Sequence, residues 1–554
     1  MASWKQFSRT DRLAVLSLAI AAILELSALT VLPMNGFDAA CHSYWIDEWH
    51  KLWNAGIFYP RWLPDSFYNF GAPSFYFYPP LSYALSSLIY GVLPGAGTQT
   101  ILKVLIGISL AASGFTMWLY LRSRTSNVIS AVLGAMIYTF APYRFLDYSA
   151  RCALSEHVAF VFVPLAFLGA DLIKKCEARV TCGLVLIGSL VFLFLTSLPA
   201  SATVLLGLAV IILAQPAREW AGQAARIGVM VILAAGLTAF YWMPIIEFHS
   251  YVHLHDLWQT GIMGTGSPIV GLLRGQSISL DLYNSLCFIG ASILLYYYWK
   301  RRKVSQLYNE SRRDGLILGL VVLLQLPYIS LPLFQYIPPF NIIQLPSRLT
   351  ILLMVIVALM WTSHLDRIRS MTAIPAVITF WSIGISILIV VHLTGFHAYG
   401  PPVTIQSLMK PDAPDYATRW LDSSLVSPAL ENGYSIADFH NIGWLLKGET
   451  ILRVQRDAYF DTVVYVSAVP SVASLHRAYW PEWKVSIDGH TVPTKPDSLG
   501  RLSFMAPAGR HIITSSLEKS TAEIAGRWIS IATLCGLILS LIIMNRKRVR
   551  ESTI

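Results

Sequence analysis

The sequence predicts a mostly α-helical, polytopic membrane protein with a β-rich domain outside the membrane near its C-terminus. Of its 554 residues, 55% are hydrophobic and only 13% are charged, whereas a soluble protein carries about 25% charged residues. Apolar runs of roughly 20 residues, the length needed to cross a bilayer, recur along the chain. One long polar segment, 395–524, interrupts this pattern before a last apolar run.

Twelve membrane spans are predicted, starting from an inside N-terminus. The first is expected to be a retained helix, because no small-residue cleavage site follows the leading WKQFSRTDR. The approximate extents are 13–33, 102–121, 128–142, 157–173, 180–197, 200–215, 227–243, 281–299, 315–333, 349–363, 372–394 and 525–544. Basic residues cluster in the inner loops, so the net charge of +10 reflects the positive-inside pattern and not nucleic-acid binding.

The apolar run Phe75–Val92 determines on which side every later loop lies. If it crossed the membrane, the basic clusters at 122–124, 174–175 and 300–303 would all lie outside. If it lies along the interface, they fall inside, and its Tyr and Phe content suits an interfacial helix. We therefore expect an interfacial helix here and cytoplasmic N- and C-termini.

The polar segment predicts a small β-rich domain. WKVSIDGHTVPT (483–494) predicts a hairpin that turns at Asp488-Gly489, and GRLSFMAPAGRHIITSSL (500–517) predicts another around Pro507–Gly509. Trp480 and Trp483 are expected in the domain core, with glycan binding as the alternative. The predicted organisation is a transmembrane domain (1–394) with a first outer loop (34–101), the β-rich domain (395–524), and a final helix with a basic tail (525–554).

Candidate chemistry gathers in the predicted outer loops. Asp38 lies just past a span and near His42; such a carboxylate can bind a divalent cation or accept a proton from a hydroxyl, although a solvated loop acid is an alternative. Asp147, Arg151 and Glu156 lie at the mouth of two spans. Charges at such depth usually face a cavity or a partner, but an Arg151–Glu156 pair that only anchors the loop is the alternative.

Later outer segments add two candidates and one open question. Glu247 follows the seventh predicted span and is expected to line the site. Arg348 opens the tenth span, where a guanidinium can hold a phosphate; snorkelling to the interface is the alternative. Cys41 and Cys152 lie in the two acidic loops, so an oxidising compartment would permit a disulfide, whereas buried thiols are the common alternative.

Several motifs together resemble a family. They are G-x-x-YPRW (56–62), YPPL (78–81), APYR with R-x-ALSE (141–144 and 151–156) and QLPSR (344–348). These resemble the bacterial membrane proteins labelled "6-pyruvoyl-tetrahydropterin synthase-related", and YWPEWKVSIDG…PAGRH (479–511) is similar to the outer domain of YfhO-type membrane proteins. Both groups resemble GT-C glycosyltransferases.

The resemblance implies a GT-C-like bundle, a sugar donor carried on a polyprenyl phosphate, and a site between the first and second outer loops. It implies that Asp38 is the base and that Asp147 or Glu156 is the second-loop acid. The departing lipid phosphate would be stabilised either by a Mg or Mn ion, with Asp38 and Asp147 as its ligands, or by Arg348. The substrate-binding residues would be His42, Tyr59, Arg61, Arg151, Glu247 and Arg348. The chain departs from the family at Phe37, where His often precedes the acid, and at TSLPAS (196–201), where a His is common.

The predicted function is therefore a hexosyl- or pentosyltransferase of the bacterial inner (cell) membrane. Sugar would pass by single displacement, with inversion, from the polyprenyl-phosphate donor to an extracytoplasmic glycan, lipid or protein of the cell envelope. The expected partners are this donor, membrane lipids and the acceptor, with no nucleic acid. Two alternatives stay open: a transporter or flippase for a lipid-linked glycan, and a non-catalytic scaffold that presents the β-rich domain.

Overall fold

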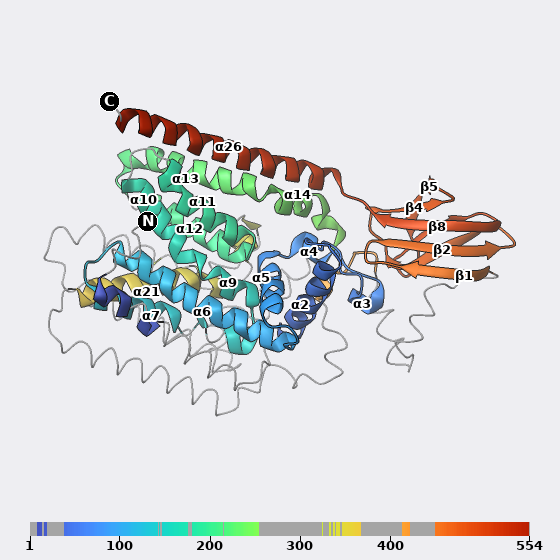
Figure 1. Cartoon of the computed structure of the whole chain (residues 1–554), viewed down its shortest axis with the longest axis horizontal. Coiled ribbons are helices and arrows are strands. Elements are labelled where there is room, and N and C mark those ends of the chain that lie inside the picture. The colour runs from blue at the N-terminus through green and yellow to red at the C-terminus, as the bar shows by residue number, and fades with distance from the viewer. Residues whose placement is uncertain are drawn as a thin grey trace.

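The computed structural model of the chain describes part of its length. The described residues are 8–13, 16–18, 38–141, 143–144, 147–175, 180–213, 215–253, 319, 324, 332–333, 336–337, 340–343, 346–366, 413–421 and 449–552. The predicted spans 281–299 and 372–394 lie outside these residues, as do most of 13–33 and 315–333. In the described part, a helical bundle meets a β domain at one end, and a last long helix runs along the bundle (Figure 1).

The helices before the β domain fall into an outer group, nearest that domain, and a bundle. The outer group is α2 (Ala39–Asn54), α3 (Ser66–Asn69), α4 (Ser74–Phe77) and α5 (Leu81–Val92). The bundle is α6 (Thr98–Arg122), α7 (Val128–Thr139), the π-helical turn η2 (Asp147–Arg151), α9 (Leu154–Ala159), α10 (Phe162–Lys175), α11 (Val180–Phe194), α12 (Leu198–Leu213), α13 (Ala217–Leu237), α14 (Ala239–Phe248) with the 3-10 turn η3 (His249–Tyr251), α20 (Phe340–Ile343), the 3-10 turn η4 (Pro346–Leu349) and α21 (Thr350–Leu365). A short 3-10 turn, η6 (Pro414–Tyr416), precedes the β domain.

Four helices of the described part are long and apolar enough to cross a membrane. They are Thr98–Arg122, Leu154–Lys174, Ala217–Leu237 and Thr521–Met544. The prediction of twelve spans is therefore not confirmed. The predicted spans 128–142, 180–197 and 200–215 are apolar helices of 12, 15 and 16 residues, and 227–243 is interrupted at Thr238, where α13 ends and α14 begins.

Helix α5 is too short to cross a bilayer. Its 12 residues extend about 18 Å at 1.5 Å per residue, against about 30 Å of hydrocarbon. It packs against α2 and α6 and leaves Leu88 and Val92 58% and 78% exposed. This geometry agrees with the interfacial helix expected for Phe75–Val92.

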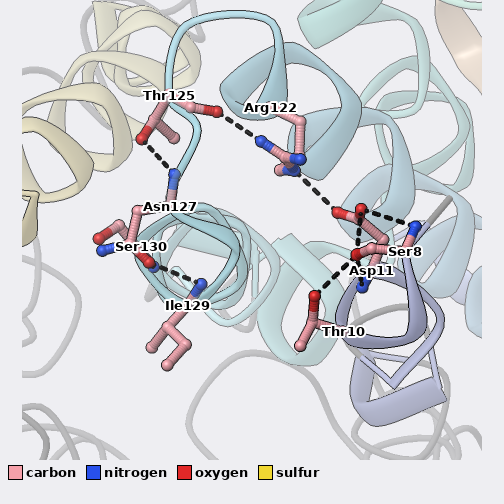
Figure 2. Close-up of polar contacts among 8 residues, drawn as sticks. All are labelled: Ser8, Thr10, Asp11, Arg122, Thr125, Asn127, Ile129 and Ser130. Carbon is pink, nitrogen blue, oxygen red and sulfur yellow. Dashed lines mark hydrogen bonds and ion pairs between the residues drawn. The ribbon is translucent and has the colours of Figure 1, made fainter.

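The end of the bundle far from the β domain is held by ion pairs among the predicted inner residues. Arg122 Nε lies 2.9 Å from Asp11 Oδ1, and Arg122 Nη1 donates to the Thr125 carbonyl over 2.6 Å (Figure 2). The Ser8 hydroxyl donates to Asp11, and the Asn127 side chain accepts from the first N–H groups of α7. These contacts attach the start of the chain to the turn between α6 and α7.

The β domain contains two antiparallel sheets. Its strands are β1 (Glu449–Arg456), β2 (Phe460–Ser467), β3 (Ser471–Ala478), β4 (Trp483–Ile487), β5 (His490–Val492), β6 (Thr494–Pro496), β7 (Arg501–Ala506) and β8 (Gly509–Leu517). The sheet orders are β1-β2-β8-β4-β5 and β3-β7-β6.

One predicted hairpin is confirmed and the other is wrong. Strands β4 and β5 pair around Asp488 and Gly489, whose φ angles of 49° and 84° fit the left-handed conformation that such a turn requires. Strands β7 and β8 do not pair, because β7 belongs to the three-stranded sheet and β8 to the five-stranded sheet. The chain passes from one sheet to the other at Pro507, which has no N–H to donate to a ladder.

The β domain is docked on the first outer loop. Trp480 and Trp483 are fully buried, as expected for core residues, and the Trp62 ring of the loop packs edge-on against Trp483 at 5.8 Å. The Ala478 N–H donates to the Phe70 carbonyl over 2.7 Å. The loop and the domain therefore share one hydrophobic core.

The last helix, α26 (Thr521–Ser552), begins directly after the β domain. Ser520 and Glu523 form a reciprocal capping box, in which each side chain accepts from the other residue's N–H. The helix packs along α13 and α14. Its apolar residues are otherwise outward-facing: Trp528 is 65% exposed and Leu539 is 57% exposed, as expected for a helix that faces lipid.

Candidate active site

The first turn of α2 is fastened to the second predicted outer loop. Asp38 is the N-cap residue of α2, and its backbone N–H donates to the Arg151 carbonyl over 2.8 Å. The Asp38 carbonyl accepts from the His42 N–H at 2.9 Å, but the Asp38 side chain makes no capping hydrogen bond. The carboxylate is therefore not used to hold the helix, and it lies beside the loop that carries Arg151.

An irregular backbone brings the second-loop side chains together. The π-helical turn from Asp147 to Arg151 is followed by Cys152 in a left-handed conformation, with φ at 57°. The Ala153 N–H then returns to the Asp147 carbonyl at 3.1 Å. This reversal places Asp147 against the start of α9, which supplies Glu156.

Glu156 is the hub of a buried ionic cluster. It is 3% exposed and accepts a 2.6 Å hydrogen bond from the Tyr143 hydroxyl on Oε1. Its Oε2 lies 3.2 Å from Arg151 Nη1 and 3.3 Å from Arg348 Nε. Arg348 comes from the turn η4, far along the chain, so three segments meet at this one carboxylate.

Asp147 has a different environment in the same cluster. It is 1% exposed; its Oδ1 lies 2.7 Å from Arg151 Nη1 and its Oδ2 lies 3.8 Å from His157 Nε2. Burial raises the pKa of Asp147 well above its usual range, and the neighbouring Glu156 raises it further, while Arg151 opposes this shift. Burial therefore favours the protonated form of Asp147, whereas Arg151 favours the carboxylate.

An aromatic wall closes the cluster on the side of α2, α4 and α5. Tyr78 packs against Trp45 with ring centroids 4.9 Å apart, and both rings contact the His42 ring. Burial raises the pKa of Tyr78, with Asp38 adding to the shift and Arg348 opposing it. Tyr78 therefore lies where the first loop, the second loop and the Arg348 turn approach one another.

Three residues predicted to bind substrate make their bonds elsewhere. Arg61 donates to Glu523 of α26 and to the Tyr76 hydroxyl, and Glu247 accepts from Ser520. Tyr59 donates to the Phe75 carbonyl over 2.9 Å. The bonds of Arg61 and Glu247 hold the joint between the first loop, α14 and the start of α26, whereas the bond of Tyr59 lies within the first loop.

The structure describes the predicted metal ligand Asp147 and the two cysteines of the predicted disulfide. Among the described residues, no group of three or more His, Cys, Asp or Glu side chains is arranged to hold a metal. Asp147 has a guanidinium against it, so the donor set around it fits a divalent cation poorly. Cys41 and Cys152 carry thiols and share no disulfide; burial raises the pKa of the Cys152 thiol, and Asp38 adds to this, which disfavours the thiolate needed for exchange.

Sequence reasoning missed several residues of the cluster and its wall. Tyr143 and Arg144 belong to the APYR motif, and Tyr78 belongs to YPPL, but none of the three was named as a site residue. Arg144 is 2% exposed, with its guanidinium 4.7 Å from the Phe160 ring centroid. The arginine of APYR, at the end of a predicted span, was the available signal, because a charge at membrane depth usually faces a cavity or a partner.

The apolar helices and the buried ionic cluster define a membrane protein with a polar site at one end of its bundle. No protein-family model and no curated protein matches the chain. Among solved structures, it is similar to the arabinofuranosyltransferase AftD from Mycobacteria, with 16% identity and a TM-score of 0.42 over 69% of this chain and 26% of that chain. The chain thus spans about a quarter of that protein's length, and a likeness this weak assigns neither its fold nor its activity.

Proposed function

We propose that this protein is a membrane glycosyltransferase that moves a sugar from a polyprenyl-phosphate donor to an extracytoplasmic acceptor. One observation carries the proposal: Asp38 lies beside a cluster in which Arg151 and Arg348 converge on Glu156. A transferase that uses a lipid-phosphate donor needs a carboxylate to act on the acceptor and a cationic group for the phosphate. Both are present at one end of an apolar bundle.

The proposed step is a single displacement. The acceptor hydroxyl oxygen forms a bond to the anomeric carbon as the bond from that carbon to the phosphate oxygen breaks, with inversion at the carbon. The hydroxyl proton passes to the Asp38 carboxylate. The electron pair of the broken bond leaves with the polyprenyl phosphate, whose developing negative charge is stabilised by Arg151 and Arg348.

The other two acids act through the arginines in this proposal. Glu156 has three donors around it, so it orients the two guanidinium groups instead of taking the proton. Asp147 accepts from Arg151 on Oδ1 and helps to hold that guanidinium in place. Because the arginines supply the positive charge, the proposed step runs on the protein's own side chains, and Mg or Mn is not given a part in it.

The setting follows from the same geometry. The polyprenyl chain would lie against the apolar helices of a bacterial inner membrane, and the acceptor, a cell-envelope glycan, lipid or protein, would approach from the side of the β domain. The proposal includes both a hexose and a pentose as the transferred sugar. A family resemblance at YPPL, APYR and QLPSR supports the proposal, because Tyr78, Tyr143 and Arg348 of these motifs lie at or against the cluster.

The decisive experiment compares two matched variants of α2. Purified protein is incubated with a panel of radiolabelled polyprenyl-phosphate sugars and a membrane fraction as acceptor. Asp38→Asn is expected to lower transfer at least about a hundredfold, because a general base contributes roughly 10²–10⁴ in rate. Asp47→Asn, the same substitution at an exposed acid of α2, is expected to leave transfer unchanged.

The alternatives give other results. Equal transfer by wild type and Asp38→Asn would remove Asp38 as the base. A non-catalytic scaffold would show no transfer with any donor, and its cellular role would survive Asp38→Ala and Glu156→Ala but not deletion of 396–523.

A further inference from the structure

His42 is a buried histidine of α2 with one ring nitrogen hydrogen-bonded and the other without a hydrogen-bond partner among the described residues. It is 2% exposed, and its Nδ1 lies 2.7 Å from the Tyr83 hydroxyl of α5. The rings of Trp45 and Tyr78 meet it edge-on at 6.3 Å and 5.9 Å. Within the described part of the chain, Nε2 is buried and has no hydrogen-bond partner.

The Tyr83 hydroxyl fixes which nitrogen carries the proton. Tyr83 is fully buried, and its O–H needs an acceptor; the contact that the described residues provide is His42 Nδ1. Donation by Tyr83 makes Nδ1 the acceptor, so a neutral ring must carry its proton on Nε2. If Tyr83 accepted instead, its own O–H and Nε2 would both be left buried without a partner. Burial lowers the pKa of His42 to about 4, so the ring is neutral at physiological pH.

The Nε2–H group of His42 lies on the helix that is joined to the ionic cluster. His42 lies one helical turn after Asp38, whose backbone N–H is bound by Arg151. The His42 ring is therefore close to the backbone contact that joins α2 to the Arg151 loop, and an anionic oxygen bound at the cluster would complete the hydrogen bonding of Nε2.

We propose that His42 donates its Nε2–H to a phosphate oxygen of the isoprenoid-linked donor, and that Tyr83 is a positioning residue that holds the imidazole in this tautomer. The inference rests on the proposed function and adds a named contact to the phosphate. Arg151 and Arg348 supply charge in that function, whereas His42 supplies one directed donor. Without the Tyr83 hydroxyl, the imidazole stays in place but its proton can lie on either ring nitrogen.

The test uses amides that imitate one nitrogen each. In a glutamine the amide nitrogen takes roughly the place of Nε2, and in an asparagine that of Nδ1. Binding of a short-chain isoprenoid monophosphate, and of the matching isoprenoid alcohol, is measured with wild type, His42→Gln, His42→Asn and Tyr83→Phe in detergent. We expect His42→Gln to bind the monophosphate within about threefold of wild type and His42→Asn to bind it about tenfold more weakly, because a hydrogen bond to a charged group is lost.

Two further readouts separate positioning from general damage. Alcohol binding is expected to be the same for all four proteins, which shows that the fold and the binding of the isoprenoid chain are intact. The ¹⁵N chemical shifts of His42, assigned by comparison with His42→Gln, are expected to show the Nε2–H form in wild type and a mixture in Tyr83→Phe. Tyr83→Phe should weaken monophosphate binding by a few-fold only.

The outcomes also separate this inference from the proposed function. If His42→Asn bound the monophosphate as tightly as wild type while wild type still transferred sugar, the inference would be wrong and the function would stand. An Nδ1–H tautomer in wild type would likewise overturn it. If wild type bound neither the monophosphate nor any donor, the donor class would be wrong, and this contact would fall with it.

Discussion

Glu156 and Asp147 are both buried carboxyl groups, yet their partners predict responses of different size to the same kind of substitution. Glu156 balances two guanidinium groups, so Glu156→Gln leaves buried positive charge uncompensated and is expected to cost about 3–5 kcal/mol. Asp147 pairs with one guanidinium, and burial raises its pKa, which makes the loss of its charge less costly. Asp147→Asn is therefore expected to cost less than Glu156→Gln.

Thermal unfolding in detergent, followed by tryptophan fluorescence, measures this difference. Asp47→Asn serves as the control for an exposed acid. Similar destabilisation by Glu156→Gln and Asp147→Asn would mean that the fold needs the charge of Asp147 as much as that of Glu156, contrary to this prediction.

At the residue scale, the sequence predicted the members of the cluster better than their partners. Acids and an arginine near span ends were sufficient to single out Glu156, Arg151 and Arg348, because charges at membrane depth are expensive. It did not predict that Arg61 pairs with Glu523, 462 positions away. A pairing across that distance depends on how the β domain folds back on the first loop, which no local pattern contains.

Helix α2 carries a buried acid whose titration makes stability depend on pH. Burial, with Asp65 adding to it, raises the pKa of Glu48 from 4.5 to about 8. Between these two values the folded state keeps a proton that the unfolded state releases, so stability falls as pH rises from 4.5 to 8 and then levels off. Glu48→Gln removes this dependence. Since one pKa unit corresponds to about 1.4 kcal/mol, Glu48→Gln is expected to be more stable than wild type above pH 8 by up to about 5 kcal/mol.

The measurement is the free energy of unfolding of both proteins at several pH values from 5 to 9. The neighbouring Asp47→Asn, at an exposed position of the same helix, should keep the slope of wild type. A Glu48→Gln profile parallel to wild type would show that Glu48 titrates normally.

The joint between the first loop and α26 should behave as one unit. Arg61 and Glu523 are 5% and 2% exposed and form an ion pair, with Tyr76 hydrogen-bonded to both. Arg61→Met and Glu523→Gln are each expected to cost about 3–5 kcal/mol, because each leaves a buried charge alone. The double variant should cost less than the sum of the two, with a coupling of about 0.5–3 kcal/mol.

Limited proteolysis of the β domain supplies a second measure for this joint. The single variants should be cut faster than wild type, because Trp62 and Phe70 of the first loop pack into the domain's core. Strict additivity of the two substitutions would contradict a direct pairing.

At the element scale, local turn chemistry was the reliable signal and sheet assignment was not. Asp-Gly between alternating residues predicted the β4–β5 hairpin correctly. The similar pattern around Pro507–Gly509 joins β7 and β8, which belong to different sheets. Two strands in sequence look the same whether they pair or pass between sheets, because the packing that decides this comes from the rest of the domain. The predicted span lengths are not confirmed either. An apolar helix that packs inside a bundle can be shorter than a helix that crosses the bilayer.

The whole molecule has two chemically distinct ends, and α6 connects them. Asp11 pairs with Arg122 at the C-terminal end of α6, whereas Trp45 and Trp49 of α2 share a core with Ile101 and Leu105 near its N-terminal end. The 25 residues of α6 extend about 37 Å, which exceeds the roughly 30 Å hydrocarbon thickness. The start of the chain and the candidate site should therefore lie on opposite sides of the membrane.

Cysteine labelling of a background without the six native cysteines measures this arrangement. Thr10→Cys, Asp47→Cys and His490→Cys each change an exposed position, near the start of the chain, on α2 and on β5. In spheroplasts of bacteria that express the protein, a membrane-impermeant maleimide should label Asp47→Cys and His490→Cys. Thr10→Cys should react only after the membrane is permeabilised.

The same experiment tests the setting of the proposed reaction. The acceptor is extracytoplasmic in that proposal, so Asp38 and the β domain must share the outer side with it. Labelling of Thr10→Cys and Asp47→Cys from one side would contradict the crossing that α6 implies. Labelling of Asp47→Cys only after permeabilisation would place the Asp38 cluster at the cytoplasmic face, where an extracytoplasmic acceptor has no access to it.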